Sequence, residues 1–145
     1  MSTKELQEKI VAIMKQWQKI ENASVASTGQ IIGQTENPVL RMVMEIIQRD
    51  SQNHHRLQRM VIDSLIHEAV SLTPEDMENV WGLIEKHIEL EKQTMQMAQE
   101  ALAALKGKKM VVQEYLINYL IQDEAKHNAM LESLNKVKAG MYPYG

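Results

Sequence analysis

The chain of 145 residues has no cysteine, only 4% aromatic residues and a formal net charge of −3. The lack of cysteine excludes disulfides, thiolate metal ligands and cysteine nucleophiles, so any metal must be held by oxygen and imidazole ligands. The small net charge gives no electrostatic basis for binding nucleic acid. The charged N-terminus is unlike a secretory signal, and no run of about 18 apolar residues predicts a membrane span. We therefore expect a cytoplasmic protein.

Few residues break the chain, which has only 6 glycines and 3 prolines, so its elements should be few and long. Three helix-start signals, each a favoured N-cap residue followed by a capping acid or a proline, lie at Ser2–Glu5, Asn37–Pro38 and Thr73–Asp76. Gly107, flanked by lysines, is typical of the left-handed position that ends a helix. We predict helices over residues 3–35, 38–69, 74–105 and 109–138.

Each predicted helix carries an apolar stripe at steps of three and four residues, and each stripe turns polar near its middle. The polar members are Glu21, Ser24, Thr28, Asp50, His54, His87, Glu91, Glu124 and His127. Burying a charged group costs several kcal/mol unless it is paired or bound to a metal. Four helices that break the apolar pattern at one level therefore indicate a shared polar site.

The two halves of the chain repeat each other. Trp17 and Glu21 align with His87 and Glu91 at an offset of 70, and the Asp50–His54 segment aligns with Asp123–His127 at an offset of 73. Each half is therefore predicted to be a helical hairpin that supplies one glutamate from its first helix and a histidine from its second.

This pattern resembles the ligand set of ferritin-like di-metal carboxylate proteins, such as the bacterioferritin and rubrerythrin bundles. The resemblance implies an all-α, antiparallel four-helix bundle built from two repeated hairpins, with residues 1–140 as the bundle and 141–145 as a C-terminal tail. It implies that the metal ligands are Glu21, His54, Glu91, Glu124 and His127. Asp50, His87 and Asp123 are implied as further ligands or as residues that orient the ligands.

The sequence departs from the family pattern at Ser51, where a second bridging glutamate is expected. Two dications held close together need negative bridges, so the site can be dinuclear with a weaker second metal, mononuclear or degenerate. The order of the helices also stays open, because the joint near 70–73 is short for a ferritin-type crossover and a plain up-down-up-down order is an alternative.

The resemblance implies a metal-binding protein with iron, or else manganese or zinc, acting as an oxidase, peroxidase or ferroxidase toward dioxygen or peroxide. We expect a homo-oligomer, with a dimer as the simplest case. One alternative is a non-catalytic scaffold or dimerisation module with a degenerate metal site. A lesser alternative is hemerythrin-like oxygen binding, for which His87-x-x-x-Glu91 has suitable spacing, although the first helix lacks the histidine that this class needs.

Overall fold

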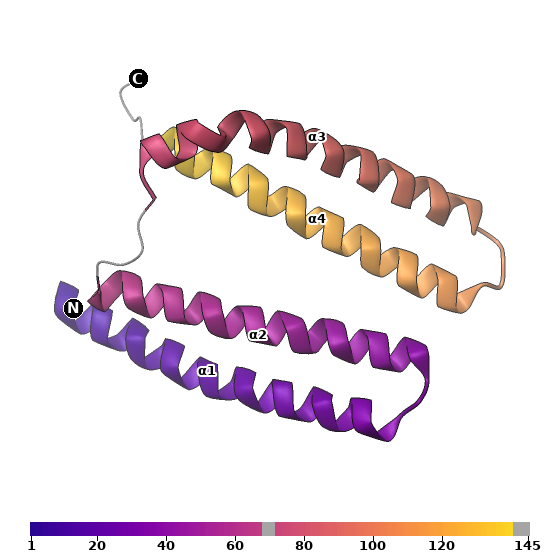
Figure 1. Cartoon of the computed structure of the whole chain (residues 1–145), viewed down its shortest axis with the longest axis horizontal. Coiled ribbons are helices and arrows are strands. Elements are labelled where there is room, and N and C mark those ends of the chain that lie inside the picture. The colour runs from indigo at the N-terminus through magenta and orange to yellow at the C-terminus, as the bar shows by residue number, and fades with distance from the viewer. Residues whose placement is uncertain (68–71, 141–145) are drawn as a thin grey trace. The chain divides into compact units, whose positions relative to one another are not determined.

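A computed structural model describes residues 1–67 and 72–140, and within these ranges every regular element is an α-helix. The helices are α1 (Thr3–Gln34), α2 (Pro38–Ile66), α3 (Pro74–Ala104) and α4 (Val111–Gly140) (Figure 1). The predicted all-helical class with four long helices is confirmed. The predicted tail at 141–145 lies outside the described residues, as does part of the joint at 70–73.

The helix ends follow the signals in the sequence. Ser2 and Glu5 form a reciprocal capping box at α1, Asn37 accepts two backbone N–H groups at the start of α2, and Thr73 forms a capping box at α3. Gly107 adopts a φ of 77°, as predicted for the turn after α3.

Two of the predicted helix boundaries were wrong by a few residues. Helix α2 ends at Ile66 rather than at 69, because His67 leaves the helical conformation at φ −131° and ψ 152°. Helix α4 begins at Val111 rather than at 109, and its first turn is closed by the hydrogen bond from the Glu114 N–H to the Met110 carbonyl.

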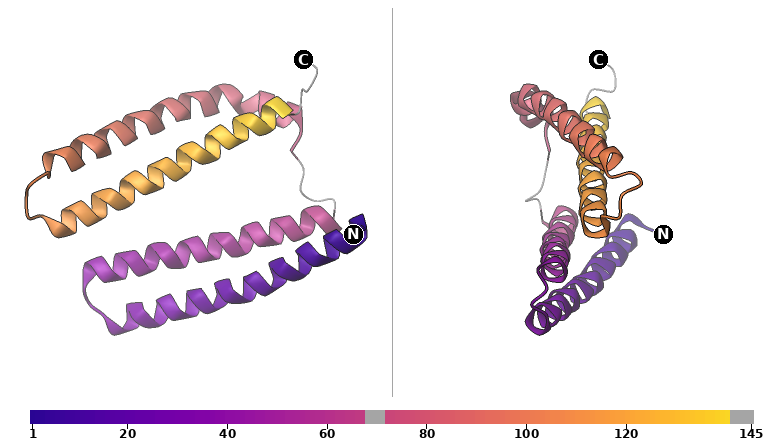
Figure 2. Two further views of the ribbon diagram at one scale, coloured as in Figure 1. Left: turned by 180° about the vertical axis from the view of Figure 1, so that it is seen from behind. Right: turned by 90° about the vertical axis from the view of Figure 1, so that its right-hand side faces the viewer.

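The helices associate as two hairpins, α1 with α2 and α3 with α4, and each hairpin forms its own compact unit (Figure 2). In the α1–α2 hairpin, polar side chains make contacts between the helices. Gln18 Nε2 donates to the His55 carbonyl at 3.2 Å, and Gln48 Nε2 donates to the Val25 carbonyl at 3.2 Å. These bonds attach the middle of α2 to α1.

The α3–α4 hairpin is joined at the start of α3 by an aromatic contact. Trp81 is buried and donates its indole N–H to Glu85, and the Lys138 ammonium of α4 lies 4.4 Å from the centre of the Trp81 ring. Such cation–π contacts favour a lysine or arginine over the face of a tryptophan ring. This contact and the buried Met77 fix the end of the hairpin.

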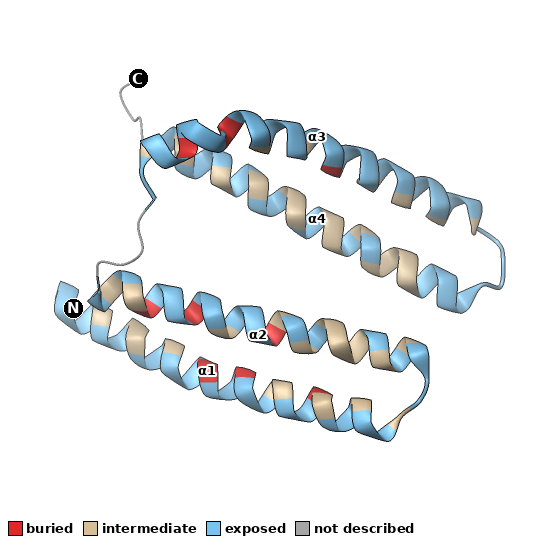
Figure 3. Ribbon diagram, in the orientation of Figure 1, coloured by how far each residue is buried: buried red, intermediate tan, exposed pale blue. Residues whose placement is uncertain are grey.

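On α2, the side that faces the partner helix differs from the predicted apolar stripe. On α2 the buried residues are Ser51, Gln58 and Ile62, whereas Leu57 and Val61 of the predicted stripe are 56% and 38% exposed within the hairpin (Figure 3). The stripe therefore identified apolar side chains that the partner helix of the same hairpin does not cover.

The internal repeat extends to the helix boundaries. Shifting α1 by 70 residues gives 73–104, which matches α3, and shifting α2 by 73 gives 111–139, which matches α4. The two offsets that aligned the predicted ligands thus align whole helices. Over the described residues, no helix has a stretch that is long and apolar enough to cross a membrane.

Candidate metal centre

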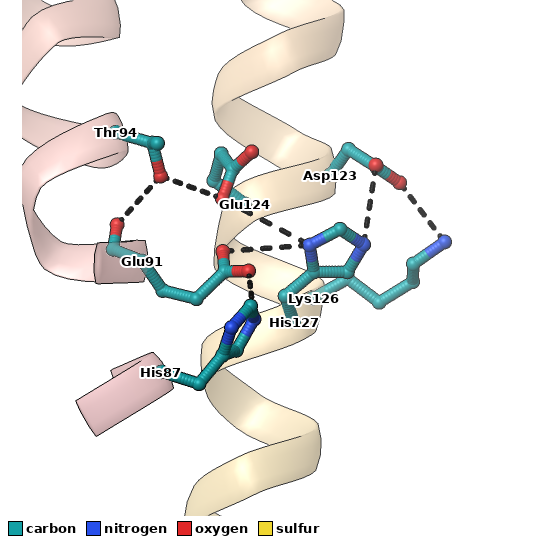
Figure 4. A network of polar contacts seen from close by, with 7 residues as sticks. All are labelled: His87, Glu91, Thr94, Asp123, Glu124, Lys126 and His127. Carbon is teal, nitrogen blue, oxygen red and sulfur yellow. Dashed lines mark hydrogen bonds and ion pairs between the residues drawn. The ribbon is translucent and has the colours of Figure 1, made fainter. Parts of the chain in front are cut away.

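Three of the predicted ligands meet on the α3–α4 hairpin. Glu91 of α3 lies opposite Glu124 and His127 of α4, and one ligand atom from each of the three lies within 4.8 Å of the other two. His127 Nδ1 is 3.4 Å from Glu91 Oε2 and 3.8 Å from Glu124 Oε2. The i,i+3 spacing of Glu124 and His127 places both on one side of α4, as Figure 4 shows.

Glu91 is the buried centre of this group, with 8% of its surface exposed. Its Oε1 lies 2.9 Å from His87 Nε2, one turn earlier on the same helix. Its Oε2 is buried and has no hydrogen-bond partner among the described residues. A buried acceptor of this kind is normally satisfied in proteins, so this oxygen has the capacity to coordinate a cation.

The carboxyl groups of Glu91 and Glu124 shift each other's pKa. The neighbouring Glu124 carboxyl lowers the pKa of Glu91, and the Glu91 carboxyl, followed by desolvation, raises the pKa of Glu124. Two adjacent carboxyl groups whose protonation is linked in this way can exchange a proton for a metal ion.

Further side chains orient the ligands. Thr94 Oγ1 lies 2.9 Å from Glu124 Oε2 and 2.9 Å from the Glu91 backbone carbonyl, so its single hydroxyl proton serves one acceptor at a time. Asp123 Oδ2 lies 3.3 Å from His127 Nε2, and Asp123 Oδ1 accepts from Lys126 at 2.9 Å (Figure 4). A carboxylate on the far nitrogen of a histidine fixes the ring with its other nitrogen toward the metal position.

The two remaining predicted ligands meet on the α1–α2 hairpin. Glu21 Oε1 lies 3.3 Å from His54 Nδ1, and Glu21 is 7% exposed. Gln58 Nε2 donates to the same carboxylate oxygen at 3.5 Å, and the Ser24 and Ser51 hydroxyls are hydrogen-bonded at 2.8 Å. Asp50 is half-buried and has no hydrogen bond or ion pair with the rest of the described chain.

Sequence reasoning missed Thr94 and Gln58, whose side chains contact the acids. The repeat contained the signal for both, because Thr94 aligns with Ser24 of the predicted stripe, and Gln58 aligns with Leu131, an apolar residue of the predicted stripe on α4. Where one hairpin has a polar residue and the other has an apolar residue at the equivalent position, as at Gln58 and Leu131, the two sites differ.

No family model, curated protein or solved structure matches the chain.

Proposed function

We propose that the protein is a ferritin-like metal-binding protein whose principal site is Glu91, Glu124 and His127 of the α3–α4 hairpin. The observation that carries the proposal is the buried Glu91 Oε2, which lacks a hydrogen bond and faces an imidazole and a second carboxylate. Two carboxylates and one imidazole, without thiolate, suit iron or manganese, and they also bind zinc.

Some residues of such a site would bind the metal and others would orient the ligands. Glu91 and Glu124 supply negative charge and His127 supplies a neutral nitrogen, while Asp123 and Thr94 hold the His127 ring and the Glu124 carboxylate in place. His87 satisfies the Glu91 oxygen that faces away from His127. Iron, when bound, supplies redox chemistry toward dioxygen or peroxide, which is the activity that the family resemblance implies.

The proposal is tested by elemental analysis of protein purified without chelator or metal-affinity tag, followed by anaerobic titration with Fe(II), Mn(II) and Zn(II). We expect a transition metal to bind at about one equivalent per chain with affinity in the micromolar range or tighter, that is, about −8 kcal/mol or below. A chain that binds none of the three ions while its helix content is unchanged contradicts the proposal and favours a non-catalytic scaffold.

In the metal-free chain, Glu124 should titrate above the ordinary range of a glutamate. Its raised pKa arises first from the neighbouring Glu91 carboxyl, so Glu91→Gln should return the titration midpoint toward the ordinary value. Because a dication needs both carboxylates ionised, metal affinity should be highest above the raised pKa and should fall as the pH drops through it. Carbon-13 NMR of the glutamate side-chain carboxyls measures the midpoint, and an unshifted Glu124 would contradict this influence of Glu91 on its pKa.

A further inference from the structure

The two hairpins place a glutamate and a histidine in nearly the same geometry. The carboxylate–imidazole distance is 3.3 Å for Glu21 and His54 and 3.4 Å for Glu91 and His127. The two glutamates are also equally buried, at 7% and 8% exposure. The same central pair therefore occurs at equivalent positions of both hairpins, and the residues around the pair differ.

The first difference concerns the second carboxylate. Ser24 and Ser51 align with Thr94 and Glu124, and both pairs are hydrogen-bonded across the helices, at 2.8 Å and 2.9 Å. The contact is thus preserved, but the α1–α2 hairpin has a neutral hydroxyl where the α3–α4 hairpin has a charged carboxylate. A serine hydroxyl is a weak ligand for a dication and does not balance its charge.

The second difference concerns the donor to the buried glutamate. Gln58 is 4% exposed and its side-chain N–H donates to Glu21 Oε1, whereas the aligned residue on α4 is Leu131, which has no donor. Glu21 Oε1 therefore faces an amide donor at 3.5 Å as well as His54, whereas Glu91 Oε2 has no amide donor, makes no hydrogen bond and lies 3.4 Å from His127. The Gln58 Oε1 atom is itself without a hydrogen-bond partner among the described residues, but as a neutral amide oxygen it adds no charge.

We infer that the α1–α2 hairpin is a latent second metal site, silenced by Ser51 and Gln58, so that the chain binds one dication rather than two. The inference rests on the proposed function of the α3–α4 hairpin. Two buried residues would prevent metal binding at this hairpin. Ser51 stands where the other hairpin has the ligand Glu124, and Gln58 occupies the Glu21 carboxylate with a hydrogen bond. We also predict that these two positions, rather than the difference between Trp17 and His87, decide which hairpin binds.

The experiment exchanges the two positions between hairpins in the full chain. The variant Ser51→Glu/Gln58→Leu should bind two equivalents of Zn(II), and the reciprocal variant Glu124→Ser/Leu131→Gln should bind none. The chain with all four substitutions should again bind one equivalent, now lost on His54→Ala and kept on His127→Ala. Equilibrium dialysis with elemental analysis gives the stoichiometry, and circular dichroism checks the helix content of every variant.

The matched control is Ser51→Gln/Gln58→Leu, which adds the same bulk without the charge and should stay at one equivalent. A natural chain that binds two equivalents and loses one in Glu21→Gln overturns the inference, whether or not the exchanged variants fold. A folded Ser51→Glu/Gln58→Leu chain that stays at one equivalent overturns it as well. A natural chain that binds no metal overturns the proposed function and this inference together, so the two failures are distinguishable.

Discussion

A saturating dication should raise the free energy of unfolding of the natural chain by about 2.7 kcal/mol when its free concentration is about 100 times Kd. For a chain of this size that corresponds to a rise in Tm of roughly 5–10 °C. The gain should vanish in Glu91→Gln and in His127→Ala, which each remove a ligand from the α3–α4 hairpin. Metal affinity itself should fall by more than about 100-fold in both, because loss of a residue that only supports a ligand already costs about 10–100-fold.

Thermal or urea unfolding, with and without metal, measures this effect. The matched control is Glu89→Gln, which makes the same change of charge two residues earlier on α3, where the side chain is 66% exposed and pairs only loosely with Lys92 at 3.9 Å. Its metal-dependent gain should equal that of the natural chain. A full gain in Glu91→Gln would contradict the assignment of Glu91 as a ligand.

Replacing Glu91 by leucine should destabilise the metal-free chain at neutral pH by about 1–3 kcal/mol, because its neighbours lower the pKa of Glu91 and so stabilise the ionised carboxylate in the folded chain. The two imidazole neighbours limit this loss, since the side chains of His87 and His127 are 57% and 39% exposed and remain hydrated. The difference between leucine and glutamate should shrink as the pH falls through the lowered pKa of Glu91.

Urea unfolding in the presence of a chelator provides the measurement, and Glu21→Leu is the matched comparison. Gln58 is buried and donates to Glu21, so its amide loses a partner in that variant, which should be destabilised by about 1–3 kcal/mol. If Glu91→Leu instead destabilises the chain by about 3–5 kcal/mol, the Glu91 network is a structural ion pair. That result would favour the scaffold alternative.

The sequence was a good guide wherever one local interaction decides the structure. The capping boxes at Ser2 and Thr73 and the positive φ of Gly107 each depend on a few neighbouring residues, and all were predicted. The pairing of Glu21 with His54 and of Glu91 with His127 was also accessible, because the repeat fixed which residues are equivalent.

The faces of the helices were harder to predict. An apolar stripe identifies a side of a helix only to within about one residue, or about 100° of rotation at 3.6 residues per turn. Gln18 and Gln58 are buried by contacts with the neighbouring helix, at 7% and 4% exposure, and hydrophobicity gives no sign of this. The network around Glu91 was incomplete for the same reason, because Thr94 is polar and lies beside the predicted stripe rather than in it.

The repeated boundaries of the four helices mean that one chain contains the same hairpin twice, linked covalently. In a homodimer of identical hairpins, every substitution appears in both halves at once, so the loss of a carboxylate from one half removes it from the other. A tandem chain is free of this symmetry. The aligned residues Ser51 and Glu124 illustrate this difference between the copies. Glu124 is an acid that is hydrogen-bonded to Thr94, whereas Ser51 is neutral and is hydrogen-bonded to Ser24. Duplication within a single chain thus permits the proposed asymmetry, in which one copy would keep the metal ligands while the other diverges.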